Sequence, residues 1–363
     1  MADLHLGRKL EKYELLPWQM ETLEKGVLPI LKSEKPDVFV LTGDVFESVY
    51  PDDVTLKIYS NFLSVVRKMS DNIIVIGGNH DNPVLIEYLS DILRLAGVHT
   101  FGKSRAYLPK VTIVDASGPV DFYVLPSIES NYLANPADPV FCKGTQEIVK
   151  QLIERTPIDP THRNVLLAHE FVYREEQKDG FKDETPRSDM VEASVFRPFD
   201  HVCMGHIHDS RAIDNRIVYS GAPYPMRYGE GNQKYLEIIS MDRKGECQWK
   251  LEPILCNALQ IHLYKASVED FRSLPPDDSA FVYVGLDTDF IPEEIDRELR
   301  EKYPLFCRCL GKDAKILQSD DNDFLQGDNT GDDPSFLIRQ IGIEEIERED
   351  GIFMKTLFRK NSQ

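Results

Sequence analysis

Up to about residue 250, stretches with helical periodicity alternate with short apolar runs, and this alternation constrains the fold more than any other feature. The helical pattern at 53–70 is followed by the run "NIIVIG", and the pattern at 144–156 by "NVLLAH". Short continuous apolar runs are typical of strands that are covered on both faces. The sequence therefore predicts an α/β sandwich, which antiparallel strands at 216–225, 234–242 and 246–254 would close.

The character of the chain changes near "LEPILCNALQ", and we place the end of the first domain there, at residue 254. Residues 255–318 show a strand–helix–strand–helix pattern that indicates a small α/β cap domain. An acidic, Gly/Asp-rich stretch at 319–334 is predicted to be a linker. In the tail, 335–363, apolar residues recur at helical spacing, so it could pack on the body or bind a partner as a helix pair.

Four of the strand-like runs end in polar clusters, and an Asp-x-His pair opens the chain. In open α/β sheets a site lies beyond the carboxyl ends of the strands, so we expect these clusters to converge. The polar residues concerned are Asp3, His5, Asp44, Asn79, His80, Asp81, His169, His206 and His208.

The residue types in these clusters point to bound metal. Carboxylate, amide oxygen and imidazole together suit Mn²⁺, Fe²⁺ or Zn²⁺. Seven such groups exceed the needs of one ion, whereas two ions about 3.5–4 Å apart would share a carboxylate, for which Asp44 is suited. His206 and His208 are two residues apart, so in an extended chain they face the same side.

The order D-x-H, GD, GNHD, a lone His and GHxH resembles the calcineurin-like metallophosphoesterases. The chain is most similar to the SbcD family, the nuclease subunit of the SbcCD complex, in "ADLHLGRKL", "LTGDVFES", "IGGNHDN", "MGHIHDS" and "YSGAPYPMRYGE". The resemblance covers roughly residues 1–310. It implies a four-layer metallophosphoesterase sandwich with a small C-terminal α/β cap domain.

The resemblance also implies roles for the clustered residues. Two divalent ions, with Mn²⁺ expected, would hold the phosphodiester oxygens and activate water. His80 would protonate the leaving oxygen, and Asp81 would orient the His80 ring. The ligands of one metal would be Asp3, His5, Asp44 and His208. The ligands of the other would be Asp44, Asn79, His169 and His206.

The function that the resemblance implies is a DNA nuclease that acts in repair and recombination. It would be a 3′→5′ exonuclease on duplex ends and an endonuclease on hairpins or single strands, working in the cytoplasm with an SbcC-type ATPase and as a homodimer. Residues bordering the expected cleft that could contact DNA are Arg8, Lys9, Arg174, Arg227 and Tyr228. Two other readings remain open: a phosphoesterase for small phosphodiesters or phosphoproteins, and a metal-free scaffold.

The net charge of −19 argues against a free-standing, high-affinity DNA-binding protein. Such a field repels phosphate backbones, so bound metals, a local basic groove or a partner would have to attract DNA. The charge does not argue against an enzyme that acts on DNA.

Two features depart from the family pattern. Glu47 stands in "GDVFES" where the family commonly has Asp, and we expect this longer outer carboxylate to be tolerated. Relatives also carry a short strand before the D-x-H pair, whereas only Met1 and Ala2 precede Asp3. We therefore expect a late-called start or a lost segment, and a frayed terminus that weakens the metal site served by Asp3 and His5.

Several other signals are expected to be structural. "GVHTFGKS", at 97–104, satisfies the Walker A pattern but has a helix before it and a strand-like "VHTF" within it, so we expect no nucleotide site there. No run of 18 apolar residues and no signal peptide is found, and the cysteine usage is typical of a cytosolic protein. Histidines expected to be structural are His99, His162, His201 and His262. Cysteines expected to be plain thiols are Cys142, Cys203, Cys247, Cys256, Cys307 and Cys309.

Overall fold

The computed structural model describes residues 1–128, 144–174, 190–242 and 246–312. These residues belong to one compact unit, Met1–Ile316. The predicted linker at 319–334 and the predicted tail at 335–363 lie outside the described residues. Within the described residues, no helix combines the length and the apolar character needed to cross a membrane.

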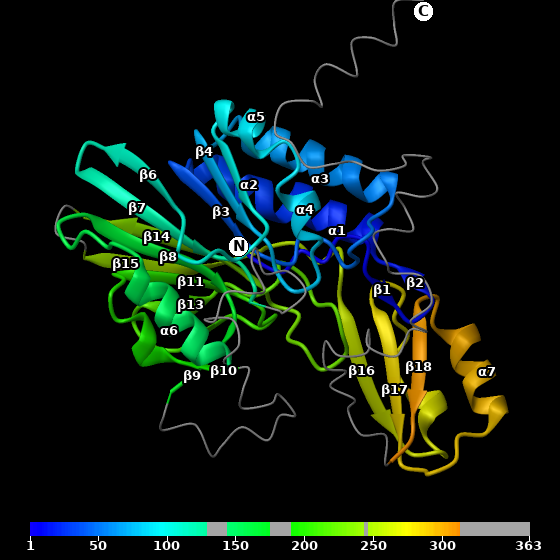
Figure 1. The fold of residues 1–363 in the computed structure, drawn as a ribbon. Helices are drawn as coiled ribbons and strands as arrows, with labels where there is room; N and C mark the ends of the chain where they lie inside the picture. Colours follow the sequence, from blue (N-terminus) through cyan, green and yellow to red (C-terminus); the bar gives the residue numbers. More distant parts are fainter. Residues whose placement is uncertain (129–143, 175–189, 243–245, 313–363) are drawn as a thin grey trace, which may run out of the picture. The chain divides into compact units, whose positions relative to one another are not determined.

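Two sheets form the centre of the fold (Figure 1). The first is parallel and has the order β3-β4-β5, from β3 (Val38–Thr42), β4 (Asn72–Ile76) and β5 (Val98–Phe101). The second has six strands in the order β12-β13-β11-β8-β7-β6. Their bounds are β6 (Lys110–Asp115), β7 (Gly118–Leu125), β8 (Arg163–His169), β11 (His201–Gly205), β12 (Arg211–Ala212) and β13 (Ile217–Tyr219).

The two sheets pack face to face through one apolar layer. Ile74 and Ile76 of β4 contribute to it from the first sheet, and Leu167 of β8 and Cys203 of β11 contribute from the second. All four are buried, as expected for strands covered on both faces. This layer brings the carboxyl ends of β3, β4, β8 and β11 toward one edge of the sandwich.

Helices cover the two outer faces. One core cluster joins the first sheet to α1 (Leu16–Thr22), the π-helix η1 (Leu23–Val27), α2 (Leu28–Glu34) and α3 (Asp53–Val66). Another joins the second sheet to α6 (Thr145–Arg155) and the 3₁₀ helix η6 (Ala193–Phe196). The order helix–sheet–sheet–helix confirms the predicted four-layer α/β sandwich.

The stretch at 83–97, which reads as one helix in the sequence, is two short ones. These are α4 (Pro83–Ile86) and α5 (Ser90–Leu95), separated at Leu89, whose φ of 59° cannot continue a right-handed helix. Pattern alone cannot reveal such a break because the apolar spacing is preserved across it. The Walker-like segment has β5 inside it, and the next described elements are the strands β6 and β7, so the helix a phosphate loop requires is absent there.

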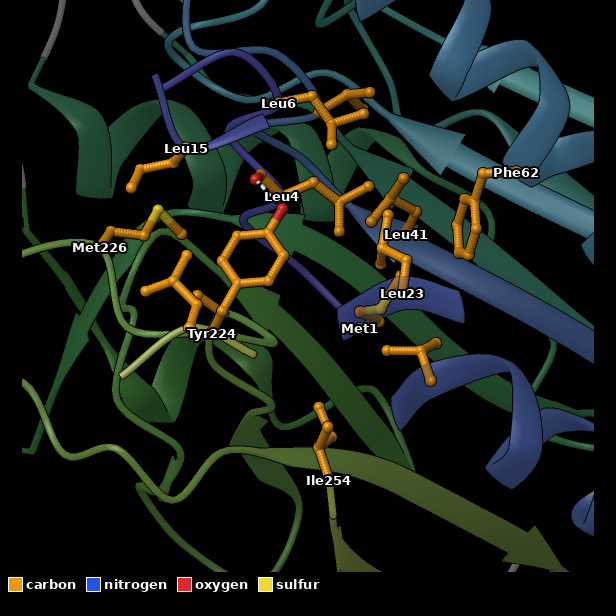
Figure 2. Packing of buried hydrophobic residues seen from close by; sticks show 14 of the residues in the cluster. Met1, Leu4, Leu6, Leu15, Leu23, Leu41, Phe62, Tyr224, Met226 and Ile254 are labelled. Atoms are coloured by element: carbon orange, nitrogen blue, oxygen red, sulfur yellow. Dashed lines mark hydrogen bonds between the residues drawn. The ribbon is translucent and has the colours of Figure 1, made fainter. Parts of the chain in front are cut away.

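The N-terminal segment is ordered, so the predicted frayed terminus is wrong. Residues 1–6 run beside β3 and the loop after it, with N–H···O bonds from Thr42 to Met1 and from Asp3 to Gly43, both 3.0 Å. An isolated parallel bridge joins Leu6 to Phe46. The buried side chains of Met1, Leu4 and Leu6 pack into the core beside Leu41 and Tyr224 (Figure 2). This segment therefore occupies the place of the strand that the sequence lacked.

Side chains hold the backbone of this segment as well. The buried Gln19 of α1 donates its amide to the carbonyl oxygens of Leu4 and His5, at 3.3 and 2.9 Å. The hydroxyl of Tyr224 also donates to the Leu4 carbonyl. Buried backbone groups need such partners, and here they fix the segment that carries Asp3 and His5.

The cap region has its own sheet and its own core. β16 (Ile261–Ala266), β17 (Phe281–Leu286) and β18 (Phe306–Leu310) are parallel neighbours, with η7 (Phe271–Ser273) and α7 (Glu293–Lys302) between them in the chain. Its cluster of buried side chains is separate from the other cores. The domain boundary at 254/255 stays a prediction.

Three small sheets complete the described chain. The largest is the antiparallel hairpin β14 (Tyr235–Met241) and β15 (Cys247–Pro253), which is not hydrogen-bonded into either central sheet. The others are the hairpin β1 (Lys9–Leu10) and β2 (Tyr13–Glu14), and the parallel pair β9 (Phe171–Tyr173) and β10 (Met190–Glu192).

Candidate metal centre

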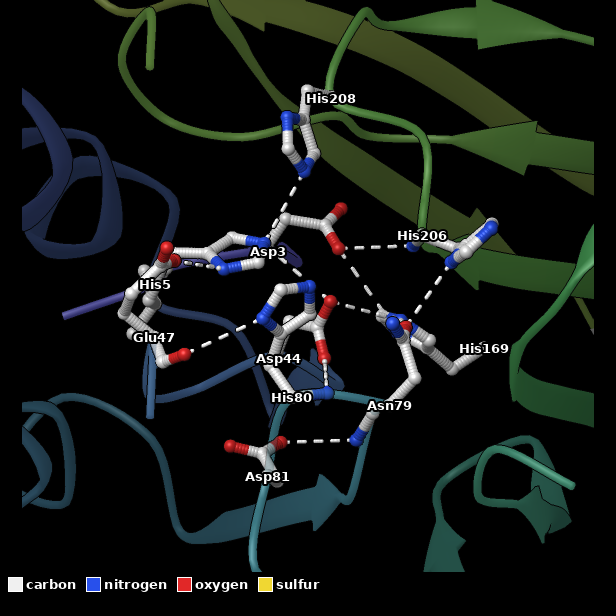
Figure 3. Close-up of polar contacts among 12 residues, drawn as sticks. Asp3, His5, Asp44, Glu47, Asn79, His80, Asp81, His169, His206 and His208 are labelled. Atoms are coloured by element: carbon white, nitrogen blue, oxygen red, sulfur yellow. Dashed lines mark hydrogen bonds and ion pairs between the residues drawn. The ribbon is translucent and has the colours of Figure 1, made fainter. Parts of the chain in front are cut away.

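The predicted site residues lie together at the carboxyl edge of the two sheets (Figure 3). The segment beside β3 supplies Asp3 and His5, and the loop after β3 supplies Asp44. The loop after β4 supplies Asn79, His80 and Asp81; β8 ends at His169; and the chain after β11 supplies His206 and His208. All seven predicted metal ligands face the same space.

One half of the cluster gathers around Asn79 and Asp44. The Oδ1 atom of Asn79 lies 3.0 Å from Nε2 of His169 and 3.2 Å from Nδ1 of His206. The same His169 nitrogen lies 3.2 Å from Oδ2 of Asp44. These are the four residues that the family resemblance assigns to one of the two ions.

The other half contains Asp3, His5 and His208, with potential ligand atoms all within 4.8 Å of one another. The Nε2 atom of His5 lies 3.2 Å from Nε2 of His208 and 3.4 Å from Oδ2 of Asp44. Asp44 thus faces both halves, as a bridging ligand must. Oδ2 of Asp3 is buried and has no hydrogen-bond partner within the described residues.

Three of the histidines are oriented through Nδ1 by an oxygen atom. Nδ1 of His5 lies 2.8 Å from the Glu47 carboxylate, and Nδ1 of His208 lies 3.0 Å from that of Glu230. Nδ1 of His169 donates to the Thr42 carbonyl at 2.8 Å. Each contact fixes the tautomer so that the Nε2 lone pair points into the cluster, the usual arrangement of metal-bound histidines.

The donor set fits two divalent cations. With both Nδ1 atoms donating to carboxylates, the Nε2 lone pairs of His5 and His208 face each other at 3.2 Å, which is repulsive unless a cation lies between them. The unpartnered Oδ2 of Asp3 has the same requirement, because an unpaired buried carboxylate oxygen is costly. Imidazole, amide and carboxylate donors of this kind suit Mn²⁺, Fe²⁺ or Zn²⁺.

The backbone at the site is strained. Seven non-glycine residues in the described chain have positive φ, and four of them are the predicted ligands Asp3, His5, Asp44 and His206. This conformation is rare for such residues and concentrates at functional sites, where packing enforces it. A Cβ on Gly43 would lie 2.1 Å from Nδ1 of His169, so the GD motif needs glycine there.

Electrostatics draws positive charge into the cluster. Burial alone would lower the pKa of His169, but the Asp44 carboxylate outweighs it and raises that pKa to about 10. Burial likewise acts to raise the pKa of Asp44, yet His169 and His5 hold it well below its usual range. Burial lowers the pKa of His5, which favours the neutral form that binds metal.

His80 lies beside the cluster without being part of the predicted ligand set. Its backbone N–H donates to Oδ1 of Asp44 at 3.0 Å, and its ring centroid is 4.6 Å from that of His5. Its Nδ1 lies 3.3 Å from the Glu47 carbonyl oxygen, which leaves Nε2 as the atom to meet a substrate. The position suits a proton donor next to bound phosphate.

The carboxylate of Asp81 accepts backbone N–H groups of Val45, Phe46 and Gly78, at 3.1, 2.9 and 2.9 Å. These bonds tie the loop that carries His80 to the loop that carries Asp44. Burial, followed by the charge of Asp44, raises the pKa of Asp81 to about 6. Orientation of the His80 ring by Asp81, which the resemblance implies, stays a prediction.

The candidate DNA contacts have different environments. Arg8 is largely buried and pairs with Glu47 at 3.0 Å, whereas Lys9 is exposed and pairs with Glu14 at 2.6 Å. Nε of Arg227 lies 3.2 Å from the Glu230 carboxylate. Tyr228 stacks on Tyr283 of the cap region with ring centroids 5.2 Å apart. Arg174 is partly buried just after β9.

Glu230 is the functional residue that sequence reasoning missed. It lies in "YSGAPYPMRYGE", a segment used for the resemblance without a role for this residue. Its buried carboxylate contacts His208, Arg227 and Lys234. Burial acts to raise the pKa of Glu230, but these three partners lower it overall, so it remains ionised. Only the fold brings it to His208, 22 residues away.

Glu230→Gln should weaken the affinity for the ion held by His208 by about 10- to 100-fold, because the ring loses its charged anchor. Mn²⁺ titration followed by calorimetry measures this effect. The matched control is Glu252→Gln, since Glu252 lies on β15 and pairs only at the surface with Lys250. Unchanged affinity in a folded Glu230→Gln protein would show that the anchor has no influence on metal binding.

Comparison with known proteins agrees with this geometry. The calcineurin-like phosphoesterase family matches residues 1–210, more than half of the chain. A curated protein from Staphylococcus saprophyticus, the D chain of the nuclease SbcCD, is 28% identical over 247 residues, which are 64% of this chain and 62% of the relative. The match therefore covers less than two thirds of that relative's own length.

A solved structure, that of TT1561 of Thermus thermophilus, is also similar. Its sequence is 14% identical, the similarity covers 65% of this chain and 94% of that chain, and the TM-score is 0.39. We base no argument on a similarity of this size. The family match covers every predicted ligand, and these ligands converge with an orphaned carboxylate oxygen and paired imidazole lone pairs. The chain belongs to the calcineurin-like phosphoesterase family.

Proposed function

We propose that this protein is the DNA nuclease subunit of an SbcCD-type complex that hydrolyses phosphodiester bonds with two divalent metal ions. The observation that carries the proposal is the convergence of seven ligating side chains on Asp44 with His80 beside them. Its similarity to the S. saprophyticus nuclease chain supports DNA as the substrate.

Each part of the site has a task in this reaction. Asp3, His5, Asp44 and His208 would hold one ion, and Asp44, Asn79, His169 and His206 the other. Two such ions supply Lewis-acid stabilisation of the phosphate and an activated water. Nε2 of His80 donates a proton to the leaving 3′ or 5′ oxygen, while the Glu47 carbonyl holds the ring through Nδ1. Asp81 keeps the two loops in register.

We propose Mn²⁺ as the working ion and both exonuclease activity, 3′→5′ on duplex ends, and endonuclease activity on hairpins or single strands. Arg8, Lys9, Arg174, Arg227 and Tyr228 border the site and would contact the DNA backbone. With a net charge of −19, these local groups and the bound ions must supply the attraction.

The proposed partners are an SbcC-type ATPase and a second copy of this chain, in the cytoplasm. The tail at 335–363 would bind the ATPase. Helix α5 has no buried residue in the single chain, which leaves its apolar side chains exposed and supports a dimer contact there. Exposed apolar residues of this region are Val84, Tyr88, Leu89, Ile92 and Leu95.

The test is cleavage by the purified full chain with Mn²⁺ or with a chelator. We expect Mn²⁺-dependent release of nucleotides from linear duplex DNA and opening of a DNA hairpin, both abolished by chelation. Turnover of a chromogenic phosphodiester or a phosphopeptide without DNA cleavage would favour a small-substrate phosphoesterase. A chain that binds no metal and cleaves nothing would be a scaffold.

A further inference from the structure

A second group of metal-binding residue types lies at the opposite end of β11 from the metal centre. His201 begins this strand, Cys203 follows on the same face, and the strand ends at Gly205, just before His206. Glu237 of β14 and Cys247 of β15 approach the same place from the hairpin. The expectation that His201 and both cysteines are merely structural needs reconsideration.

The first three of these residues form a tight, dry cluster. One nitrogen of His201, the sulfur of Cys203 and one oxygen of Glu237 all lie within 4.8 Å of one another. His201 is fully buried, Cys203 is 3% exposed, and the side chain of Glu237 is 3% exposed. Ordinary ionisable groups are rarely buried so deeply unless they have a specific partner.

The hydrogen bonding of His201 is incomplete. Its Nε2 lies 2.6 Å from Oε1 of Glu237, but its buried Nδ1 has no hydrogen-bond partner within the described residues. An unpaired buried imidazole nitrogen is costly. A carboxylate on one nitrogen with the other left open is the arrangement that orients a histidine toward a metal.

Both thiols act on the same ring. Burial alone would lower the pKa of His201, but Cys203, Cys247 and Glu237 raise it to about 12. Burial raises the pKa of the Cys203 thiol, so this thiol stays protonated unless a cation is bound. Neutral imidazole with two thiolates would balance the charge of one divalent ion, and binding would release two thiol protons to solvent.

We propose that His201, Cys203 and Cys247, with Glu237 as the fourth ligand or as the anchor of His201, form a separate site for a thiophilic divalent ion, Zn²⁺. A tetrahedral zinc site places its ligand atoms roughly 3.5 Å apart, a spacing that this cluster reaches with small side-chain movements. The ion would fasten the β14–β15 hairpin, which shares no backbone hydrogen-bond ladder with the central sheets, to β11.

Cobalt distinguishes this site from the metal centre, because the predicted ligands of the metal centre offer only nitrogen and oxygen. The full chain, purified under reducing conditions and loaded with Co²⁺, should show a sulfur-to-cobalt charge-transfer band in the near ultraviolet. Added Zn²⁺ should displace the band. Zinc content should be one equivalent higher per chain than in Cys203→Ala.

Cys203→Ala should abolish the band, whereas the matched control Cys256→Ala should retain it, since Cys256 lies elsewhere, near Glu21. Loss of the band must not abolish Mn²⁺ binding at the metal centre, which calorimetry checks independently of nuclease activity. If wild-type protein gives no sulfur-to-cobalt band although Co²⁺ occupies the metal centre, the cluster is only a buried His201–Glu237 ion pair and the proposal fails.

Discussion

Asp44→Asn should lower Mn²⁺-dependent hydrolysis of DNA by at least about 10³-fold, equivalent to about 4 kcal/mol in the activation barrier. Oδ2 of Asp44 faces His5 at 3.4 Å and His169 at 3.2 Å, so one carboxylate serves both halves of the site. Asparagine keeps the shape and the oxygen that accepts the His80 N–H, but it removes the negative charge between the cations. The number of Mn²⁺ ions bound per chain should fall below two.

Metal content by elemental analysis, measured beside DNA cleavage, checks this prediction. The matched control is Asp209→Asn, because Asp209 follows the ligand His208 directly but is 62% exposed and pairs with Lys234. The control should retain both ions and most of the activity. If Asp44→Asn binds two ions as tightly as wild type, Asp44 does not bridge them and the two-metal proposal is wrong.

The sequence predicted the sandwich and the meeting of the clusters for physical reasons. Helical periodicity and buried apolar runs report directly on layers, because each face must bury its apolar side. Polar residues that follow buried strands must gather at one edge, since parallel strands present their carboxyl ends together. Asp44, Asn79 and His169 meet for this reason, without any knowledge of loop conformation.

What the sequence could not predict depends on tertiary contacts. A six-residue terminal segment has no periodicity of its own, so nothing in it announces the bonds from Gln19 and Tyr224 that order it. The left-handed residue Leu89 leaves the apolar spacing unchanged while it divides a helix. Glu230 and His208 meet only after folding, as do His201 and Glu237.

These differences have a consequence for the site itself. Asp3 and His5 were expected to be the weaker ligands because they stand at a terminus. In the structure both are fully buried, and the His5 carbonyl is held by Gln19. Their positive φ values, 54° and 41°, persist because these surrounding bonds enforce them. The half of the site that they serve is therefore as preorganised as the half built on β4 and β8.

His80→Ala should reduce DNA hydrolysis by about 10²- to 10⁴-fold while both metal ions remain bound. His80 contributes no ligand to the predicted set, and its backbone N–H, which contacts Asp44, survives the substitution. The ring is what is lost. The control His99→Ala changes a half-buried histidine on β5, outside the site, and should leave activity near the wild-type level.

The chemical role of His80 is tested by varying the leaving group. If Nε2 protonates the departing oxygen, a p-nitrophenyl diester, whose leaving group needs no proton, should lose far less activity in His80→Ala than DNA does. Added imidazole should restore part of the DNA cleavage. An equal loss on both substrates would instead assign His80 to binding the phosphate, because stabilisation of phosphate charge does not depend on the basicity of the leaving oxygen.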